Sequence, residues 1–263
     1  MKQYPSFTVV TVTYNAGDTI GRTLDSVASQ TYEAIEHLII DGCSSDETMR
    51  EIHLYVERNT DTKHPHSIRL IREPDRGLYD AMNKAIINAK GDYIVFLNAG
   101  DKFHDNSTIE KVAATIRRFS AARRPVVAYG ETDLVDDSGQ FIRHRRLSAP
   151  ERLTSRSFLF GMLVCHQSFY VRSDTARRFL YDLRYRYSAD YDWCIRIMRH
   201  AEKRGLPMAN VGEILTDYLA EGMTTRHQRA SLFERLRIMA RHYGWFAALA
   251  SHLWIVVRAI FVR

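Results

Sequence analysis

The chain contains few cysteines, and their spacing argues against two of their usual roles. Only three of the 263 residues are Cys, namely Cys43, Cys165 and Cys194. An odd number of well-separated cysteines without a C-x-x-C pair argues against a disulfide framework and against a zinc site. The histidines show no H-E-x-x-H or similar ligand spacing either. We therefore expect a reduced, cytoplasmic compartment.

Other signatures are also missing. The N-terminus, residues 1–6, is short and polar, so we expect no signal peptide. No G-x-G-x-x-G follows a strand-like segment, which argues against a dinucleotide-dependent dehydrogenase. The net charge of +6 favours anionic partners such as phosphates or acidic lipids. No basic run is interleaved with aromatic residues, so we expect no nucleic acid partner.

The sequence does contain an alternation of apolar strand-like and amphipathic helix-like segments. Strands are predicted at 7–13, 36–41, 67–72 and 92–97, and helices at 18–29, 45–58 and 78–89. Further strands are predicted at 126–130, 141–145 and 163–171, and helices at 190–204 and 232–243. The alternation predicts an α/β fold with a mostly parallel, doubly wound central sheet flanked by helices. A C-terminal helical appendage follows.

Polar residues follow each of the first four predicted strands. Ligands of such sheets bind at the carboxyl ends of the strands. The segments at those ends are 13–17, 41–46, 72–77 and 98–101. Each contains an acid or an amide close to a buried strand, so we expect a polar crevice here and not four unrelated turns.

The last of these segments suits a metal and a diphosphate. A divalent cation that bridges a diphosphate needs one or two carboxylates at the end of a rigid element. Asp101 is a candidate metal ligand, and Asn98 can hydrogen-bond the ribose or the diphosphate. Gly100 allows the phosphates to approach closely. The alternative is an ordinary Asp in a turn after a strand.

Two other strand ends carry candidate nucleotide ligands. Asp41 can accept hydrogen bonds from a base, or the loop after it can simply form a turn and a helix cap at Ser44 or Ser45. Asp75 can bind ribose or base, and Arg76 can neutralise a phosphate. The ordinary alternative is a surface salt bridge between Asp75 and Arg76.

Together these segments resemble the family 2 glycosyltransferases. The matching stretches are VVTVTYNAGDTIGRTLDSVASQTY, EHLIIDGCSSDET, EPDRGLYDAMNKAIINAKGDYIVFLNAGD, HQSFYVR and SADYDWCIR. The resemblance implies the GT-A fold and a nucleotide-diphospho-sugar donor, with UDP favoured over GDP or dTDP. It also implies a divalent metal (Mn²⁺ or Mg²⁺), inversion, and a glycan or lipid-linked acceptor in bacterial surface-polysaccharide biosynthesis.

The resemblance assigns roles to individual residues of the donor site. Thr13, Tyr14 and Asn15, with Asp41, fall where the family holds the base. The D-x-D position of the family falls on residues 98–101, where Asn98 and Gly100 occupy places at which many members have Asp. Asp101 is therefore the acidic ligand that remains there.

The resemblance also implies a catalytic base at the start of a later helix. The family's Asp aligns with Asp190, which would take the proton from the acceptor hydroxyl. Asp192 is the rival base, and either acid can instead cap the helix.

His166 and Gln167 belong to a block that can line the acceptor site, or His166 can be a buried structural histidine. Arg226 and His227 are candidates for a loop that touches the diphosphate.

The C-terminal stretch 245–262 is apolar except for a few residues, and an Arg at 258 disfavours a membrane-spanning helix. On one helical wheel the polar stripe contains Arg237, Arg241, Ser251 and Arg258, which predicts a helix at a membrane interface. Packing against the protein itself is the alternative.

We expect a transferase domain over 1–225, with a nucleotide-binding half at 1–101 and an acceptor-side half at 102–225. The helical segment 226–263 then places the protein peripherally at the inner face of the cytoplasmic membrane. Two other functions stay open. One is a degenerate nucleotide-sugar-binding scaffold, because the metal loop has lost acids. The other is a sugar nucleotidyltransferase, which the absence of a basic loop after the first strand disfavours.

Overall fold

The central strands form where the sequence is apolar and β-branched. The structure is a computed structural model that describes residues 4–61, 65–220 and 228–261. Both β1 (Phe7–Thr13) and β2 (Ile35–Asp41) are buried along their whole length, as expected for strands covered on both faces. With β3 (Ser67–Arg72) and β4 (Tyr93–Phe96) they form a parallel sheet in the order β3-β2-β1-β4.

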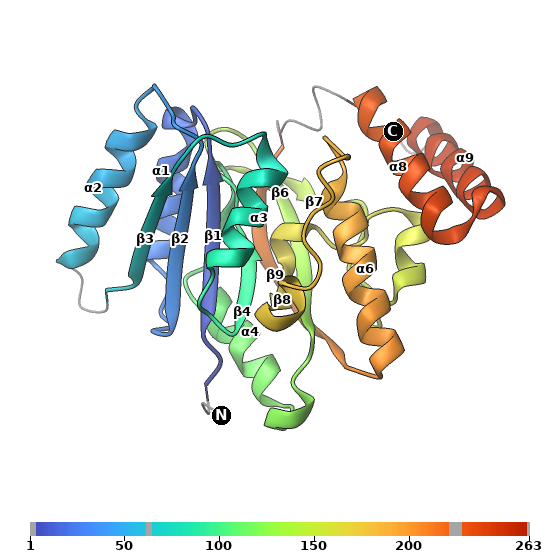
Figure 1. The fold of residues 1–263 in the computed structure, drawn as a ribbon, viewed down its shortest axis with the longest axis horizontal. Coiled ribbons are helices and arrows are strands. Elements are labelled where there is room, and N and C mark those ends of the chain that lie inside the picture. The colour runs from blue at the N-terminus through green and yellow to red at the C-terminus, as the bar shows by residue number, and fades with distance from the viewer. Residues whose placement is uncertain (1–3, 62–64, 221–227, 262–263) are drawn as a thin grey trace.

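The sheet continues through the second half of the chain (Figure 1). The remaining strands are β5 (Lys102–Phe103), β6 (Val127–Val135), β7 (Phe141–His144), β8 (Phe169–Arg172) and β9 (Met208–Leu219). Their order beyond β4 is β8-β6-β9-β5, and β7 pairs with β6. β8 runs antiparallel to both β4 and β6, whereas β6 and β9 are parallel. The α/β class with a curled, mostly parallel sheet is confirmed.

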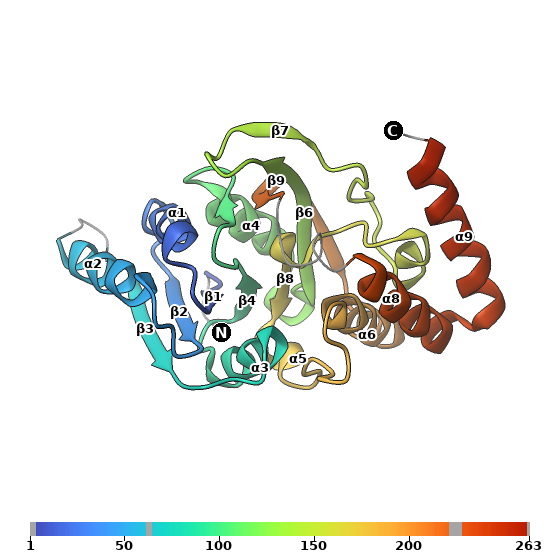
Figure 2. The ribbon, with the colours of Figure 1, turned by 90° about the horizontal axis from the view of Figure 1, so that it is seen from above.

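Helices cover both faces of this sheet (Figures 1 and 2). They are α1 (Gly17–Ala28), α2 (Thr48–Thr60), α3 (Leu78–Asn88), α4 (Thr108–Arg117), α5 (Ser173–Ala176), α6 (Ala189–Arg204), α8 (Gln228–Tyr243) and α9 (Trp245–Phe261). Short 3₁₀ turns lie at η1 (Ala121–Arg123), η2 (Ser155–Phe160) and η3 (His166–Ser168). Apolar residues of α3 and α6 pack on one face, and those of α1, α2 and α4 pack on the other.

Some predicted elements were wrong in their extent. The helix expected from Ser45 begins at Thr48, because Ser44 bonds Asp41 instead of capping a helix. The strand expected over 163–171 is interrupted by η3, in which the Ser168 N–H donates to the Cys165 carbonyl, so β8 starts only at Phe169. α4 and the long strand β9 were not predicted.

The C-terminal helices lie at one end of the molecule, away from α2 (Figures 1 and 2). The helix breaks at Gly244, which has a φ of +85° and separates α8 from α9. Ser251 is only 5% exposed, and its hydroxyl donates to the Leu159 carbonyl. The single polar stripe expected along this segment is therefore wrong, because Ser251 faces the protein. Among the described residues, no helix is long and apolar enough to cross a membrane.

Candidate active site

Three loops meet at the carboxyl edge of the parallel strands. A Cβ atom on Gly42 would lie 2.5 Å from Oδ2 of Asp75 and 3.3 Å from the Tyr14 ring. The ends of β1, β2 and β3 are therefore in contact, as the strand order requires. Asn15 adopts a left-handed φ of 48°, a conformation that Asn tolerates better than most residues. Three of the four expected strand ends are thus brought together here.

Asp41 is held firmly beneath this edge. Its side chain is fully buried, and it accepts hydrogen bonds from the backbone N–H and the hydroxyl of Ser44. Nε of Arg72 lies 3.2 Å from its Oδ2 atom. Ser44 Oγ in turn accepts from the Asn15 N–H, and the Ser45 N–H donates to the Asn15 side-chain oxygen. Asp41 thus fixes the shape of the two loops that the family resemblance associates with the base.

The loop after β3 carries a charged side chain, Arg76, that is exposed to solvent. Arg76 is 79% exposed in its side chain and pairs with Asp80, at 3.2 Å, and not with Asp75. Asp75 accepts from the Gly77 N–H through its other oxygen. The surface salt bridge expected between Asp75 and Arg76 is therefore replaced by an i,i+4 pair, which leaves Asp75 beside Gly42.

Asp101 is buried and bonded within the protein. It is 4% exposed; its Oδ2 accepts from Nε2 of Gln167 at 2.9 Å, and its Oδ1 accepts from the Leu219 N–H at 3.1 Å. Burial raises the pKa of this carboxyl to about 6, although the two hydrogen bonds act in the opposite direction. The Thr23 hydroxyl fixes the same turn, since it accepts from the Gly100 N–H and donates to the Asp101 carbonyl.

Asp190 lies between two side chains from other elements. Its Oδ2 is 3.2 Å from Nδ1 of His166, and its Oδ1 accepts a hydrogen bond of 3.1 Å from the Tyr79 hydroxyl. The other ring nitrogen of His166 is 3.1 Å from the side-chain nitrogen of Asn98. A continuous chain of contacts therefore joins the loop after β4 to the N-terminus of α6.

The contacts with His166 and Tyr79 affect the ionisation of the Asp190 carboxyl group. Burial opposes the charge on Asp190, but the hydrogen bond and charge of His166, together with the charge of Arg235, lower the pKa of its carboxyl. Burial and the neighbouring Asp190 raise the pKa of Tyr79 well above its usual range, so Tyr79 stays a hydrogen-bond donor. Asp190 is consequently a carboxylate at neutral pH.

Asp192 has a different environment. It is fully buried, with Arg196 Nε 2.6 Å from one oxygen and His242 Nε2 2.7 Å from the other. These contacts tie α6 to α8 and occupy both oxygens. Neither acid is the residue at the helix cap, since α6 begins after Ser188. Asp190 and Asp192 thus face different partners despite their two-residue separation.

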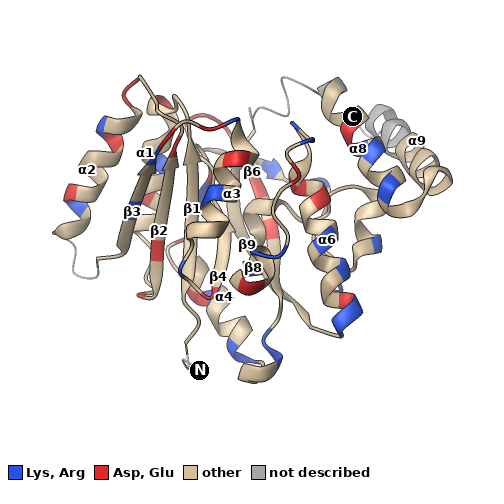
Figure 3. Ribbon diagram, viewed as in Figure 1, with Lys and Arg blue, Asp and Glu red and all other residues tan. Residues whose placement is uncertain are grey.

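A pocket of about 290 Å³ opens beside Asp190 and His166. Four arginines line it, namely Arg143, Arg145, Arg146 and Arg235. Figure 3 shows basic residues on α6 and α8, the helices at this end of the molecule. Sequence reasoning missed these arginines as well as Tyr79. The basic run at 143–146 was the available signal, but nothing in it indicated which pocket the side chains line.

Two buried polar atoms at the ends of β1 and β4 have no hydrogen-bond partner within the described residues. They are Oγ1 of Thr13 and Oδ1 of Asn98. Buried polar groups are normally paired, so both atoms suit a ligand at the ends of β1 and β4. Arg226 and His227 lie outside the described residues.

The chain resembles a family of known proteins over most of its length. The model of glycosyl transferase family 2 matches residues 8–180. The chain belongs to this family. A PGL/p-HBAD biosynthesis glycosyltransferase of Mycobacterium bovis is 33% identical over 195 residues, which cover 73% of this chain and 69% of the relative. The amylovoran biosynthesis glycosyltransferase AmsB of Erwinia amylovora is 28% identical over 252 residues. The aligned region covers 94% of this family 2 chain and 79% of AmsB.

Two solved structures share the fold of this family 2 enzyme. S. aureus TarS (1–349) in complex with UDP-GlcNAc has a TM-score of 0.66 at 16% identity, covering 89% of this chain and 66% of TarS. The mannosyltransferase PcManGT of Pyrobaculum calidifontis, in complex with GDP-Man and Mn²⁺, has a TM-score of 0.61 at 16% identity. That match covers 98% of this chain and 76% of PcManGT. The chain is a glycosyltransferase with the GT-A fold, and its relatives are named for PGL/p-HBAD and amylovoran biosynthesis.

Proposed function

We propose that this family 2 glycosyltransferase inverts the anomeric carbon as it moves a sugar from a nucleotide-diphospho-sugar to an acceptor hydroxyl. The observation that carries the proposal is the position of Asp190 at the wall of a pocket, between His166 and Tyr79. A sugar hydroxyl is a weak nucleophile, and a positioned carboxylate assists it by accepting its proton. One displacement from the face opposite the leaving group gives inversion.

The neighbours of Asp190 have defined tasks in this mechanism. His166 and Tyr79 each bond one carboxylate oxygen, which orients the group and keeps it ionised. The remaining lone pairs of the carboxylate are available to the acceptor hydroxyl. Asn98 belongs to the donor loop, residues 98–101. Its contact with His166 links this loop to the catalytic base Asp190. One connected set of side chains therefore positions both the sugar donor and the catalytic base Asp190.

The donor occupies the edge formed by the ends of β1, β2 and β4. The nucleotide base of the donor is proposed to be held by Thr13, Tyr14, Asn15 and Asp41. Asp75 then contacts the ribose or the nucleotide base, Asn98 contacts the ribose or the diphosphate, and Arg76, exposed on its loop, contacts a phosphate. A UDP-sugar is the favoured donor, with GDP or dTDP as alternatives. The complexes of TarS with UDP-GlcNAc and of PcManGT with GDP-Man support a nucleotide-sugar.

A divalent metal, Mn²⁺ or Mg²⁺, is proposed to accompany the diphosphate, with Asp101 as its protein ligand. Each Asp101 oxygen accepts one hydrogen bond and so keeps a lone pair, which is what a monodentate ligand needs. When bound, the metal supplies Lewis-acid stabilisation of the diphosphate charge. Gln167 and the Leu219 N–H orient Asp101 toward that role. The Mn²⁺ complex of PcManGT supports this proposal.

The acceptor is proposed to be a glycan or a lipid-linked sugar of bacterial surface-polysaccharide biosynthesis. His166 and Gln167 then border the acceptor, and Arg226 and His227 contact the diphosphate. The relatives named for amylovoran and PGL/p-HBAD biosynthesis support such an acceptor. Residues 1–101 form the nucleotide-binding half and 102–225 the acceptor-side half.

The C-terminal segment 226–263 is proposed to contact the cytoplasmic face of a membrane, so that the protein is cytoplasmic and peripheral. Large apolar residues of α9 are exposed, among them Phe246 at 94%, Leu253 at 65% and Trp245 at 60%. Arg237 and Arg241 are exposed on the adjacent α8. Exposed aromatic residues beside basic ones are typical of an interfacial helix.

A degenerate scaffold that binds a nucleotide-sugar without turnover is the second candidate. It is favoured by Asn98 and Gly100 in the metal loop and by the bonded, buried state of Asp101.

Calorimetric binding of UDP, GDP and dTDP, with and without Mn²⁺, tests the donor site. Tight, metal-dependent binding of one nucleotide, lost in Asp101→Ala, supports the transferase. Slow hydrolysis of the matching nucleotide-sugar, abolished in Asp190→Asn, separates the transferase from the scaffold. A folded protein that binds none of the three nucleotides contradicts both candidates.

A further inference from the structure

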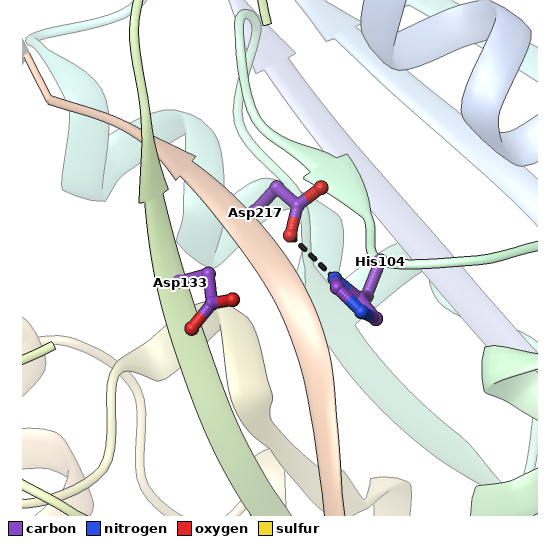
Figure 4. Close-up of side chains that lie close together, drawn as sticks. All are labelled: His104, Asp133 and Asp217. Carbon is purple, nitrogen blue, oxygen red and sulfur yellow. Dashed lines mark hydrogen bonds and ion pairs between the residues drawn. The ribbon is translucent and has the colours of Figure 1, made fainter. Parts of the chain in front are cut away.

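A second cluster of chemistry-bearing side chains lies on the other face of the sheet. Asp133 on β6 pairs in register with Asp217 on β9, so the two carboxylates stand side by side. Lys102 of β5 is the register partner of Asp217, and His144 of β7 is that of Asp133. His104 follows β5 and points at Asp217 (Figure 4).

The cluster has the dimensions of a cation site. Nδ1 of His104 is 2.7 Å from Oδ1 of Asp217, and Nδ1 of His144 is 2.8 Å from Oδ1 of Asp133. One ligand atom from each of His104, Asp133 and Asp217 lies within 4.8 Å of the other two. The two acids are only 4% and 5% exposed, whereas both imidazoles reach solvent.

This cluster is separate from the candidate active site. The residues that precede the two acids are Thr132 and Thr216, and these bond Ser168 and the Gln167 carbonyl, respectively, on the side of η3. Successive side chains of a strand point to opposite faces. Asp133 and Asp217 therefore face away from η3, and a donor bound near Asp101 and Asn98 does not reach them.

Two adjacent, nearly buried carboxylates need positive charge beside them. Within the described residues, the only permanent cation that pairs with either acid is Lys102, whose Nζ is 3.0 Å from Oδ2 of Asp217. A divalent ion supplies more charge at one point and uses an imidazole nitrogen as a ligand. A mixed set of imidazole and carboxylate ligands suits Zn²⁺ and other transition metals, whereas Mg²⁺ and Ca²⁺ prefer oxygen alone.

We propose that His104, Asp133 and Asp217 bind a structural transition-metal ion, with Zn²⁺ preferred, and that His144 contacts the ligand Asp133 from outside. The ion links β6, β9 and the residue that follows β5. Asp217 lies two residues before Leu219, whose N–H holds Asp101. The ion thus stabilises the strand that supports the donor loop, without contacting the donor. Lys102 is 32% exposed in its side chain, so it can turn into solvent when the ion binds.

The test is calorimetric titration of the chelator-treated full-length protein with ZnCl₂, MnCl₂ and MgCl₂, with no nucleotide present and any histidine tag removed. One Zn²⁺ per chain and little response to Mg²⁺ are expected. His104→Ala, at a partly exposed position, should weaken Zn²⁺ binding by more than about 100-fold, the upper range for changes that only affect outer-shell groups. Asp217→Asn should do the same, and circular dichroism shows whether that variant is folded.

Two control variants separate a metal site from an ion-pair network. Lys102→Met removes the competing ammonium, so it should tighten Zn²⁺ binding and raise the Zn²⁺-dependent increase in melting temperature. In an ion-pair network it would lower the melting temperature with and without Zn²⁺. Asp101→Asn should leave nucleotide-free Zn²⁺ binding unchanged. Absence of Zn²⁺ binding by the folded wild-type protein, or equal binding by His104→Ala, overturns the proposal and leaves the proposed transferase function intact.

Discussion

Oδ2 of Asp190, on α6, lies 3.2 Å from Nδ1 of His166, on η3, although the two residues are 24 positions apart. The same imidazole contacts Asn98 through its other nitrogen. The two ring nitrogens of His166 therefore bridge Asn98 and Asp190. His166 then holds the base of the proposed mechanism and the donor loop in a fixed relation.

Asp190→Asn should lower kcat by about 10²–10⁴-fold, the usual contribution of a general base. Donor affinity should change little, since Asn keeps the shape of the side chain. Steady-state kinetics and nucleotide calorimetry measure the two effects. Asp192→Asn is the matched control: it breaks a buried pair with Arg196 and His242, which costs about 3–5 kcal/mol of stability. A normal kcat in Asp190→Asn would remove Asp190 from the mechanism.

His166→Ala should shift the pH dependence of the reaction. His166 lowers the pKa of Asp190 by its hydrogen bond and its charge, so its removal raises that pKa. The carboxylate form is then lost at a higher pH as the solution is acidified, and the acidic limb of kcat/KM moves upward. The pH–rate profile measures this shift. Tyr79→Phe serves as a comparison because it removes a hydrogen bond without removing a titratable imidazole. An acidic limb that stays in place in His166→Ala contradicts this coupling.

Metal-dependent nucleotide binding should weaken in acid. The pKa of Asp101 is raised to about 6, so the group is neutral below that value and a ligand above it. Because a proton and a metal compete for the carboxylate, Mn²⁺-dependent affinity should fall about tenfold per pH unit below 6. Calorimetry of the favoured nucleotide from pH 5 to pH 8 measures this trend. Asp101→Asn should bind with no Mn²⁺ dependence at any pH; if the variant retains the wild-type dependence, another residue is the ligand.

Phe246→Ser should reduce binding to vesicles that contain anionic lipid by about tenfold or more, since burial of a large apolar side chain contributes about 1.5–3 kcal/mol. Trp254→Ser, at 56% exposure on the same helix, should behave alike. Ile87→Ser is the control, because Ile87 is 62% exposed on α3. Vesicle co-sedimentation compares the three variants. If all three variants bind the vesicles equally, or if the wild-type protein does not bind them, α9 does not contact the membrane.

The sequence by itself determined the parallel half of the sheet. β1 and β3 have the predicted bounds: β1 is an apolar, β-branched run, and β3 mixes apolar and polar residues between polar loops. It also singled out Asn98 and Asp101, which lie within the residues 8–180 that the family model matches, and Asp190, which lies beyond them. Loops at strand ends are short-range features, so the residues around them suffice to find them.

Only the tertiary structure decided which side chains meet. The contact of Asp190 with His166 and Tyr79 depends on packing between α6, η3 and α3, which no local pattern encodes. β9 escaped prediction because buried and more exposed positions do not alternate regularly along it. The Asp133 and Asp217 cluster arises from the register of two strands more than 70 residues apart. Register depends on the whole sheet, and therefore a single sequence, read segment by segment, does not contain it.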